Sequence, residues 1–123
     1  MSKSSVLVVD DEPLVRWSVS ETLADAGYGV EQAHDEQSTL RAMSEADHSP
    51  DVVLLDVYLP DCSDLRVLAS IRRMSPHTSV IMMTAHGSPQ LAADAHALGA
   101  FAVLDKPFDM AVLPALVASA LAA

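Results

Sequence analysis

Five times along the chain, a short aliphatic run is followed by a longer segment whose apolar residues recur at helical spacing. The short runs lie at residues 6–9, 28–33, 51–56, 79–84 and 101–104. Most are apolar at consecutive positions, which is typical of strands in a parallel sheet that helices cover on both faces. Short connections and right-handed crossovers then favour one architecture, an α/β fold with a doubly wound, five-stranded parallel sheet.

Helix signals stand at the ends of the longer segments. Pro13 suits the first turn of the first helix, and Gly27 suits its end. Asp35 is a candidate cap for the second helix, and Ser63 or Asp64 for the third, because their side-chain oxygens can accept hydrogen bonds from the first free backbone amides. These signals support the division into strands and helices.

Length, charge and cysteine content exclude several classes of protein. A chain of 123 residues suits one domain, which we expect to span residues 1–123 with a core of about 6–121. The formal net charge of −10 disfavours direct contact with nucleic acid. Cys62 is the single cysteine, so an internal disulfide is impossible, which fits a reducing compartment. Without a signal peptide or an apolar stretch of roughly 18 residues, a cytoplasmic protein with no membrane contact is predicted.

Polar side chains follow four of the five predicted strands. They are Asp10 and Asp11 after the first strand, Asp56 at the third, Thr84 at the fourth and Lys106 after the fifth. Because ligands bind beyond the carboxyl ends of the strands in such sheets, we expect these side chains to lie together. Crowded carboxylates raise one another's pKa unless a cation intervenes. Oxygen ligands of this kind favour Mg²⁺.

This combination indicates transfer of a phosphoryl group to a carboxylate. A metal ion, an ammonium group and a hydroxyl around Asp56 would stabilise the phosphoryl oxygens during transfer, with Asp56 as the nucleophile. Taken singly, each residue has an ordinary explanation, since an Asp after a strand most often forms a turn or caps a helix, and Lys-Pro is common in loops. Their joint occurrence at one sheet edge favours the functional interpretation.

Four short motifs carry a resemblance to a known family. They are VVDDEP at residues 8–13, LDVYLP at 55–60, MTA at 83–85 and DKPF at 105–108. In order and spacing they resemble the receiver domain of the bacterial response regulators, the phosphoacceptor half of two-component signalling. The resemblance covers essentially the whole chain, from Val6 to the last helix. It implies a flavodoxin-like (βα)5 fold with strand order 2-1-3-4-5.

The resemblance also implies a role for each residue of the predicted site. Asp56 would be the phosphorylation site, with Thr84 and Lys106 contacting the phosphoryl oxygens. The three strand-end carboxylates and the backbone carbonyl of Tyr58 would bind Mg²⁺. The donor would be a phospho-histidine on a histidine kinase or phosphotransfer protein. A domain of this kind phosphorylates itself and then loses the group to water, so it is a switch rather than an enzyme that turns over outside substrates.

Positions around the site follow or depart from the family pattern. Tyr58 and His86 stand where the family's residues flank the path of the attacking water, so Tyr58 is expected to shield the phosphoryl group, whereas His86 orients water or faces solvent. Val103 stands where the family usually has an aromatic residue that swings inward with the threonine. Phe101 is near, but the sequence leaves its direction open. The threonine half of the switch is therefore expected to operate without the aromatic half.

Two acids lie where the family often has glycine. Asp61 and Asp64 follow the third strand, and since Gly tolerates a positive φ better than Asp does, either acid indicates a different turn. We interpret both as solvated loop acids, with Asp64 or Ser63 capping the next helix, in preference to extra metal ligands.

The last predicted helix, from about residue 109, is unusually apolar. Ser119 is the one polar side chain in residues 110–123. One face, which includes Leu116, is expected to meet the sheet; the other is either an exposed interaction patch or a modest Ala-rich face. His96 lies on the same side of the molecule. Because the family commonly uses the face of helix 4, strand 5 and helix 5 for contacts, we predict a phosphorylation-promoted homodimer or a partner contact through it.

Two other functions stay open beside the switch. One is a pseudo-receiver that only binds a partner, disfavoured because all five site residues are present. The less favoured one is a Mg²⁺-dependent phosphohydrolase. Such enzymes typically carry Asp-x-Asp after the first strand, whereas Asp10 and Asp11 are adjacent, and the chain has no Gly-x-x-x-x-Gly-Lys-Ser/Thr loop. Residues 16–18 and 84–88 resemble receivers of NtrC-type transcriptional activators, so the chain is either a stand-alone receiver or part of a longer regulator.

Overall fold

The computed structural model, which describes residues 3–45 and 49–123, contains one five-stranded parallel sheet. Its strands are β1 (Ser5–Val9), β2 (Gly29–Ala33), β3 (Val52–Asp56), β4 (Ser79–Thr84) and β5 (Ala102–Asp105). Their order, β2-β1-β3-β4-β5, confirms the predicted flavodoxin-like topology. In the register, Val9 pairs with Leu55 and Thr84 with Asp105. The carboxyl ends of the adjacent strands β1, β3, β4 and β5 therefore meet at one edge of the sheet.

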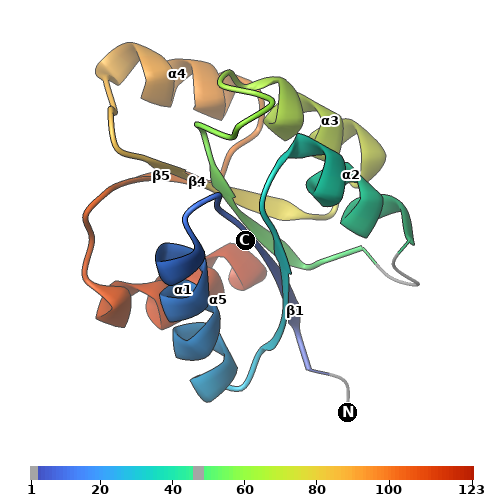
Figure 1. Cartoon of the computed structure of the whole chain (residues 1–123), viewed down its shortest axis with the longest axis vertical. Coiled ribbons are helices and arrows are strands. Elements are labelled where there is room, and N and C mark those ends of the chain that lie inside the picture. Colours follow the sequence, from blue (N-terminus) through green and yellow to red (C-terminus); the bar gives the residue numbers. More distant parts are fainter. Residues whose placement is uncertain (1–2, 46–48) are drawn as a thin grey trace.

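Helices cover both faces of the sheet (Figure 1). They are α1 (Pro13–Asp25), α2 (Glu36–Glu45), α3 (Arg66–Met74), α4 (Pro89–Ala97) and α5 (Leu113–Ala122), with a 3₁₀ turn, η1 (Met110–Val112), before α5. The helices α1 and α5 pack on one face, and α2, α3 and α4 on the other. Among the described residues, no helix combines the length and the apolar character that crossing a membrane requires.

Two hydrophobic clusters, one on each face of the sheet, form the core. Along β3 the side chains alternate between them: Val53 and Leu55 pack toward α2, α3 and α4, whereas Val52 and Leu54 pack toward α1 and α5. All four are 1% exposed or less. Burial on both faces explains why this run is apolar at every position, and each such side chain contributes about 1.5–3 kcal/mol relative to an exposed one.

The helix ends follow the predicted signals. Gly27 lies just after α1 with φ +98°, a left-handed conformation that Gly adopts without strain. The side chain of Asp35 accepts a hydrogen bond from the backbone amide of Ser38 at 2.7 Å, so Asp35 caps α2 as predicted. Before α3, the choice between the two candidates falls on Asp64, whose Oδ1 accepts from the amide of Arg66, the first helical residue, at 2.9 Å.

Two expectations from the sequence need correction or refinement. Asp61 is exposed, but it is not a free loop acid, because its carboxylate accepts hydrogen bonds from the backbone amides that begin α2. Neither Asp61 nor Asp64 has a positive φ. Of the two alternatives for the last helix, the structure favours the modest face: the exposed positions in the middle of α5 are Ala115, Ala118 and Ser119, and Leu116 is half-buried against the core. Near the end of the helix, Leu121 was expected to face the sheet but is 36% exposed.

Candidate functional site

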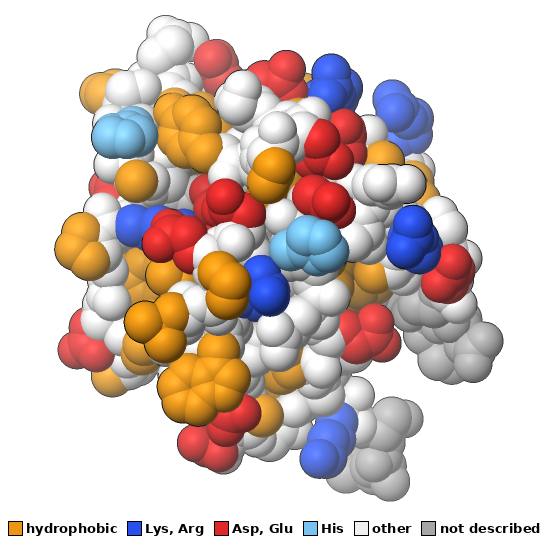
Figure 2. Space-filling model, in the orientation of Figure 1, with side chains coloured by type: hydrophobic (Ala, Val, Ile, Leu, Met, Phe, Trp, Pro, Cys, Tyr) orange, Lys and Arg blue, Asp and Glu red, His pale blue; other side chains and the backbone are white. Residues whose placement is uncertain are grey.

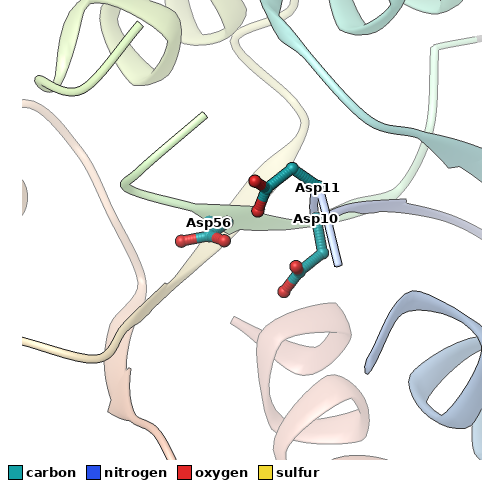
Figure 3. Close-up of side chains that lie close together, drawn as sticks. All are labelled: Asp10, Asp11 and Asp56. Carbon is teal, nitrogen blue, oxygen red and sulfur yellow. The ribbon is translucent and has the colours of Figure 1, made fainter. Parts of the chain in front are cut away.

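Three carboxylates meet where β1 and β3 end side by side. Asp10 and Asp11 follow β1, and Asp56 is the last residue of β3. A carboxylate oxygen of each lies within 4.8 Å of an oxygen of the other two. Figure 3 shows Asp10, Asp11 and Asp56 together at this edge of the sheet. Asp10 is fully buried, Asp56 is 5% exposed and Asp11 is exposed, so the cluster is open to solvent on one side.

Lys106 supplies the positive charge of the cluster. Its ammonium nitrogen lies 2.7 Å from Oδ2 of Asp10 and 3.2 Å from Oδ2 of Asp56, and more loosely, at 3.7 Å, from Glu12. The backbone amide of Lys106 donates to the carbonyl of Thr84 at 2.8 Å, which fixes the end of β5 against β4. The structure thus brings the predicted lysine to the two most buried carboxylates.

Backbone amides hold the remaining oxygens of the two buried carboxylates. The amide of Glu12 donates to Oδ1 of Asp10 at 2.9 Å, and the amide of Tyr58 donates to Oδ1 of Asp56 at 3.0 Å. Each carboxylate therefore has one oxygen bonded to an amide two residues ahead and the other to Lys106. Both groups are held in fixed orientations before any ligand arrives, which is the preorganisation that charge stabilisation in a site requires.

The pKa of Asp56 is raised, but its main cause differs from the carboxylate repulsion that the sequence suggests. Burial is the largest effect that raises the pKa of Asp56, and the charge of Asp10 adds to it, while the Tyr58 amide and Lys106 oppose it. Burial lowers the pKa of Lys106, but its hydrogen bonds and ion pairs with Asp10 and Asp56 together raise it above the usual value. The sequence predicted carboxylate repulsion; desolvation is the larger contribution for Asp56.

Thr84 and the two flanking residues lie beside the acids. Thr84 is fully buried at the end of β4, and its Oγ1 accepts a hydrogen bond from the amide of His86 at 3.1 Å. The rings of Tyr58 and His86 pack edge to face, with centroids 5.8 Å apart and planes at 74°. Tyr58 is 41% exposed. The side chains of Tyr58 and His86 therefore contact each other at the rim of the site, which the sequence did not predict.

The residues expected at the switch and interface do not share one surface. Val103 is half-buried in the cluster beside α4, with a cavity of about 320 Å³ next to it. Phe101 and Leu116 pack into the opposite cluster, with α1 and α5. Phe101 therefore does not take the place of the aromatic residue that is missing at Val103. His96 is exposed on α4, and its Nδ1 lies 3.1 Å from the carbonyl of Ala100.

An exposed apolar surface beside the site was not predicted. Leu14 and Trp17 on α1 are 74% and 57% exposed, and Val112 of the adjacent η1 is 43% exposed. We call these three residues the α1 patch. Figure 2 shows hydrophobic side chains over this part of the molecule, below the acidic side chains near the centre of the face. A cavity of about 350 Å³ links α1 to the site, with Val15 and Lys106 in its lining.

A signal for the α1 patch was present in the sequence. The predicted inner face of the first helix carries residues such as Val19, which is fully buried. Leu14 and Trp17 lie off that face, so two large apolar side chains stand where an amphipathic helix normally has polar ones. Large exposed apolar side chains that cluster are the usual mark of an interaction surface.

The fold and its acidic edge define a flavodoxin-like α/β domain with a candidate cation and phosphoryl site at the carboxyl ends of its strands. Residues 6–118 match the family model described as the response regulator receiver domain. The chain therefore belongs to the response regulator receiver domain family.

Relatives and solved structures agree with this assignment. The chain is 37% identical over 121 residues to the DNA-binding transcriptional regulator NtrC of Escherichia coli strain K12, covering 98% of this chain but 25% of that protein. It thus spans about a quarter of the length of such relatives. Among solved structures, a CheY-like receiver domain protein from Methanospirillum hungatei JF-1 has a TM-score of 0.91 at 26% identity, covering 98% of this chain and 95% of that one. The receiver domain of NtrX from Brucella abortus has a TM-score of 0.86 at 34% identity, with 95% and 98% covered.

Proposed function

We propose that the chain is the phosphoacceptor switch of a two-component system, in which Asp56 accepts a phosphoryl group from the phospho-histidine of a histidine kinase or phosphotransfer protein. The observation that carries the proposal is the position of Lys106, whose ammonium group lies within 3.2 Å of both Asp10 and Asp56. An ammonium group there neutralises part of the negative charge that would otherwise repel an incoming phosphoryl group. We place the reaction in the cytoplasm, where Cys62 stays a thiol.

The transfer needs no proton on the nucleophile. A carboxylate oxygen of Asp56 attacks phosphorus and forms the new O–P bond, while the N–P bond of the phospho-histidine breaks and its electron pair returns to the imidazole nitrogen, which takes a proton from water. Hydrolysis resets the switch: water attacks phosphorus, the O–P bond to Asp56 breaks, and the free carboxylate and inorganic phosphate are formed. The tyrosine–histidine pair of Tyr58 and His86 lies at the rim, where it limits the approach of that water.

The oxygen ligands at the site fit a magnesium ion. Asp10, Asp11 and Asp56 offer carboxylate oxygens that lie within 4.8 Å of one another, and Mg²⁺ prefers such ligands together with water and phosphate oxygens. We propose that these three residues and the backbone carbonyl of Tyr58 would hold it. When bound, Mg²⁺ supplies positive charge to the phosphoryl oxygens. The fixed orientation of Asp10 and Asp56 by the amides of Glu12 and Tyr58 prepares both residues for this role.

The output of the switch runs through Thr84. Its hydroxyl both donates and accepts, so it can bond a phosphoryl oxygen, and any shift of Oγ1 acts on the amide of His86 and hence on the segment that leads into α4. Val103 is small, and Phe101 lies on the other face of the sheet. The change therefore reaches the face of α4, β5 and α5, where we propose the homodimer or partner contact, through this segment rather than through an aromatic residue.

The α1 patch suits the docking of the phosphodonor. A donor must bring its imidazole to Asp56, and Leu14, Trp17 and Val112 form an exposed apolar surface next to the site. Contact there would hold the donor over Lys106 without covering the phosphoryl path. This assigns the donor to the exposed side of α1 and the output to the face of α4, β5 and α5.

The chemical test is reductive trapping of the acyl phosphate. After incubation with a small phosphodonor and Mg²⁺, borohydride reduces an aspartyl phosphate to homoserine, which peptide mapping locates. Homoserine at position 56 supports the switch. No trapped residue, under conditions in which another receiver domain reacts, would favour the pseudo-receiver, and steady release of phosphate from many donors per chain without a trapped intermediate would favour the phosphohydrolase.

A further inference from the structure

A tight turn follows the proposed phosphorylation site. Leu59 and Cys62 form an isolated antiparallel bridge, with the amide of Leu59 donating to the carbonyl of Cys62 at 2.9 Å and the reverse bond at 3.2 Å. The two residues between them are Pro60 and Asp61, and Pro suits the first of the two central positions because its φ is fixed. Asp61 therefore lies at the tip of a turn that begins three residues after Asp56.

The carboxylate of Asp61 bridges from this turn to a different helix. Oδ1 accepts a hydrogen bond from the amide of Glu36 at 2.7 Å, and Oδ2 accepts from the amide of Gln37 at 3.3 Å. These are the first two amides of α2, which have no partner within the helix and carry the positive end of its dipole. Asp35 bonds the third amide, that of Ser38. The two aspartates thus share the helix start, one from each side.

A second contact joins the same two elements. Both Nε and Nη2 of Arg66, at the start of α3, lie 3.2 Å from the carboxylate oxygens of Glu36. This two-point ion pair is exposed, so by itself it contributes little. Together with Asp61 it holds the middle and the carboxyl end of the segment between β3 and α3 against the first turn of α2. We call the pair of hydrogen bonds made by Asp61 the Asp61 clip.

We propose that Asp61 is a positioning residue for the cation site, acting through the backbone of Tyr58. Tyr58 lies between two anchors: its amide is bonded to Asp56, and the next residue, Leu59, is bridged to Cys62. The direction of the Tyr58 carbonyl therefore depends on how the turn is oriented, and the Asp61 clip fixes the turn to α2. The inference rests on the proposed function, because it treats that carbonyl as a Mg²⁺ ligand.

The test compares Asp61→Ala with Asp35→Ala in the whole chain. Both variants remove one negative charge and one carboxylate from the start of α2, but only Asp61 belongs to the turn after β3. A calorimetric titration with MgCl₂ alone measures the affinity for Mg²⁺. This affinity should be weakened roughly three- to tenfold in Asp61→Ala and little changed in Asp35→Ala. Asp61→Asn keeps one acceptor oxygen and should lie between Asp61→Ala and the native chain.

Hydrogen exchange without metal provides a readout that does not depend on Mg²⁺. The amides of Leu59 and Cys62 should exchange faster in Asp61→Ala, and at the native rate in Asp35→Ala. Equal Mg²⁺ affinities in the two variants would overturn the proposal, whether or not these two amides exchange faster in Asp61→Ala. Failure of the native chain itself to bind Mg²⁺ would instead contradict the proposed function, and faster exchange in Asp61→Ala would still establish the clip.

Discussion

The ammonium nitrogen of Lys106 lies 2.7 Å from Oδ2 of Asp10, a carboxylate without solvent exposure, across 96 residues of sequence. The same nitrogen reaches Asp56 at 3.2 Å. The pair joins the ends of β1 and β5, two strands that do not touch in the sheet. One cation thus holds the two most buried acids of the site, and its removal leaves both carboxylates without the ammonium group to which they are bonded.

Substitution Lys106→Met should therefore destabilise the metal-free protein. Removing one partner of a buried ion pair leaves an uncompensated charge, which costs about 3–5 kcal/mol. Urea unfolding in the presence of a chelator measures the loss. Added Mg²⁺ should recover more stability in Lys106→Met than in the native chain, because the acids then have no competing cation.

Lys3→Met is the matched control, since Lys3 is exposed and its removal changes the net charge by the same amount. Its unfolding free energy should stay within about 0.5 kcal/mol of the native value. Equal losses in the two variants would mean that the ion pairs of Lys106 do not stabilise the fold.

Asp56→Asn should raise the melting temperature of the metal-free protein at pH 7. The raised pKa of Asp56 means that the folded chain holds this proton more tightly than the unfolded chain does. The free energy of unfolding therefore falls as the pH rises from the pKa of Asp56 in the unfolded chain to its higher pKa in the folded chain. Above the folded-state pKa the loss is complete and constant. Asn removes that loss, which is a gain of roughly 2–6 °C if it amounts to about 1 kcal/mol.

The gain from Asp56→Asn should disappear in acid. Below about pH 3 the carboxyl is neutral in both the folded and the unfolded chain, so the substitution no longer changes the charge. Melting curves at pH 7 and pH 3 measure both values. A melting temperature that falls clearly at pH 7 would mean that the ionised carboxylate is not held at a cost.

Tyr58→Ala should change the lifetime of the phosphoryl group severalfold. Tyr58 is partly exposed and packs edge to face on His86, so its removal opens the rim of the site to water. The half-life of the phosphorylated chain, followed after the donor is removed, measures the effect, with a faster loss expected. His86→Ala removes the other half of the contact and should act in the same direction. An unchanged half-life in Tyr58→Ala would exclude shielding.

Trp17→Ala should slow phosphorylation by a protein donor and leave a small donor unaffected. Trp17 is 57% exposed on α1 and makes no hydrogen bond to the site residues described above. With a phosphorylated histidine kinase that phosphorylates the native chain, the rate should fall at least about fivefold, because central aromatic contacts dominate interfaces. Met74→Ala, another exposed apolar residue but on α3, is the control. Equal rates for Trp17→Ala and the native chain with the protein donor would remove the α1 patch from donor docking.

Much of the fold is predictable from the sequence because strand and helix signals agree. The run at Val52 to Leu55 is apolar at each position, which requires cover on both faces, and the structure buries all of it. Asp35 and Gly27 mark helix ends by side-chain chemistry and by conformational freedom, both local properties. The grouping of Asp10, Asp11, Asp56 and Lys106 follows from topology alone, since the carboxyl ends of parallel strands share one edge.

Contacts between loops and helices far apart in sequence were not predictable in the same way. The Asp61 clip joins residues 24 and 25 positions apart, and nothing local to Asp61 shows that the start of α2 lies within reach. The direction of Phe101 depends on where β5 begins, and the strand begins one residue later than the sequence suggested. The α1 patch is not predictable from helix periodicity, because the buried positions such as Val19 identify the inner face, whereas the exposure of Leu14 and Trp17 depends on what packs around the helix.

Intact-mass spectrometry with a small phosphodonor and Mg²⁺ tests the central claim most directly. The native chain should gain the mass of one phosphoryl group, the gain should vanish with a chelator, and Asp56→Asn should show none. Asp11→Asn should show a reduced gain that more Mg²⁺ partly restores, since the exposed carboxylate is one ligand among several. An unmodified native chain beside a reacting receiver domain, or an equal adduct on Asp56→Asn, would contradict the account.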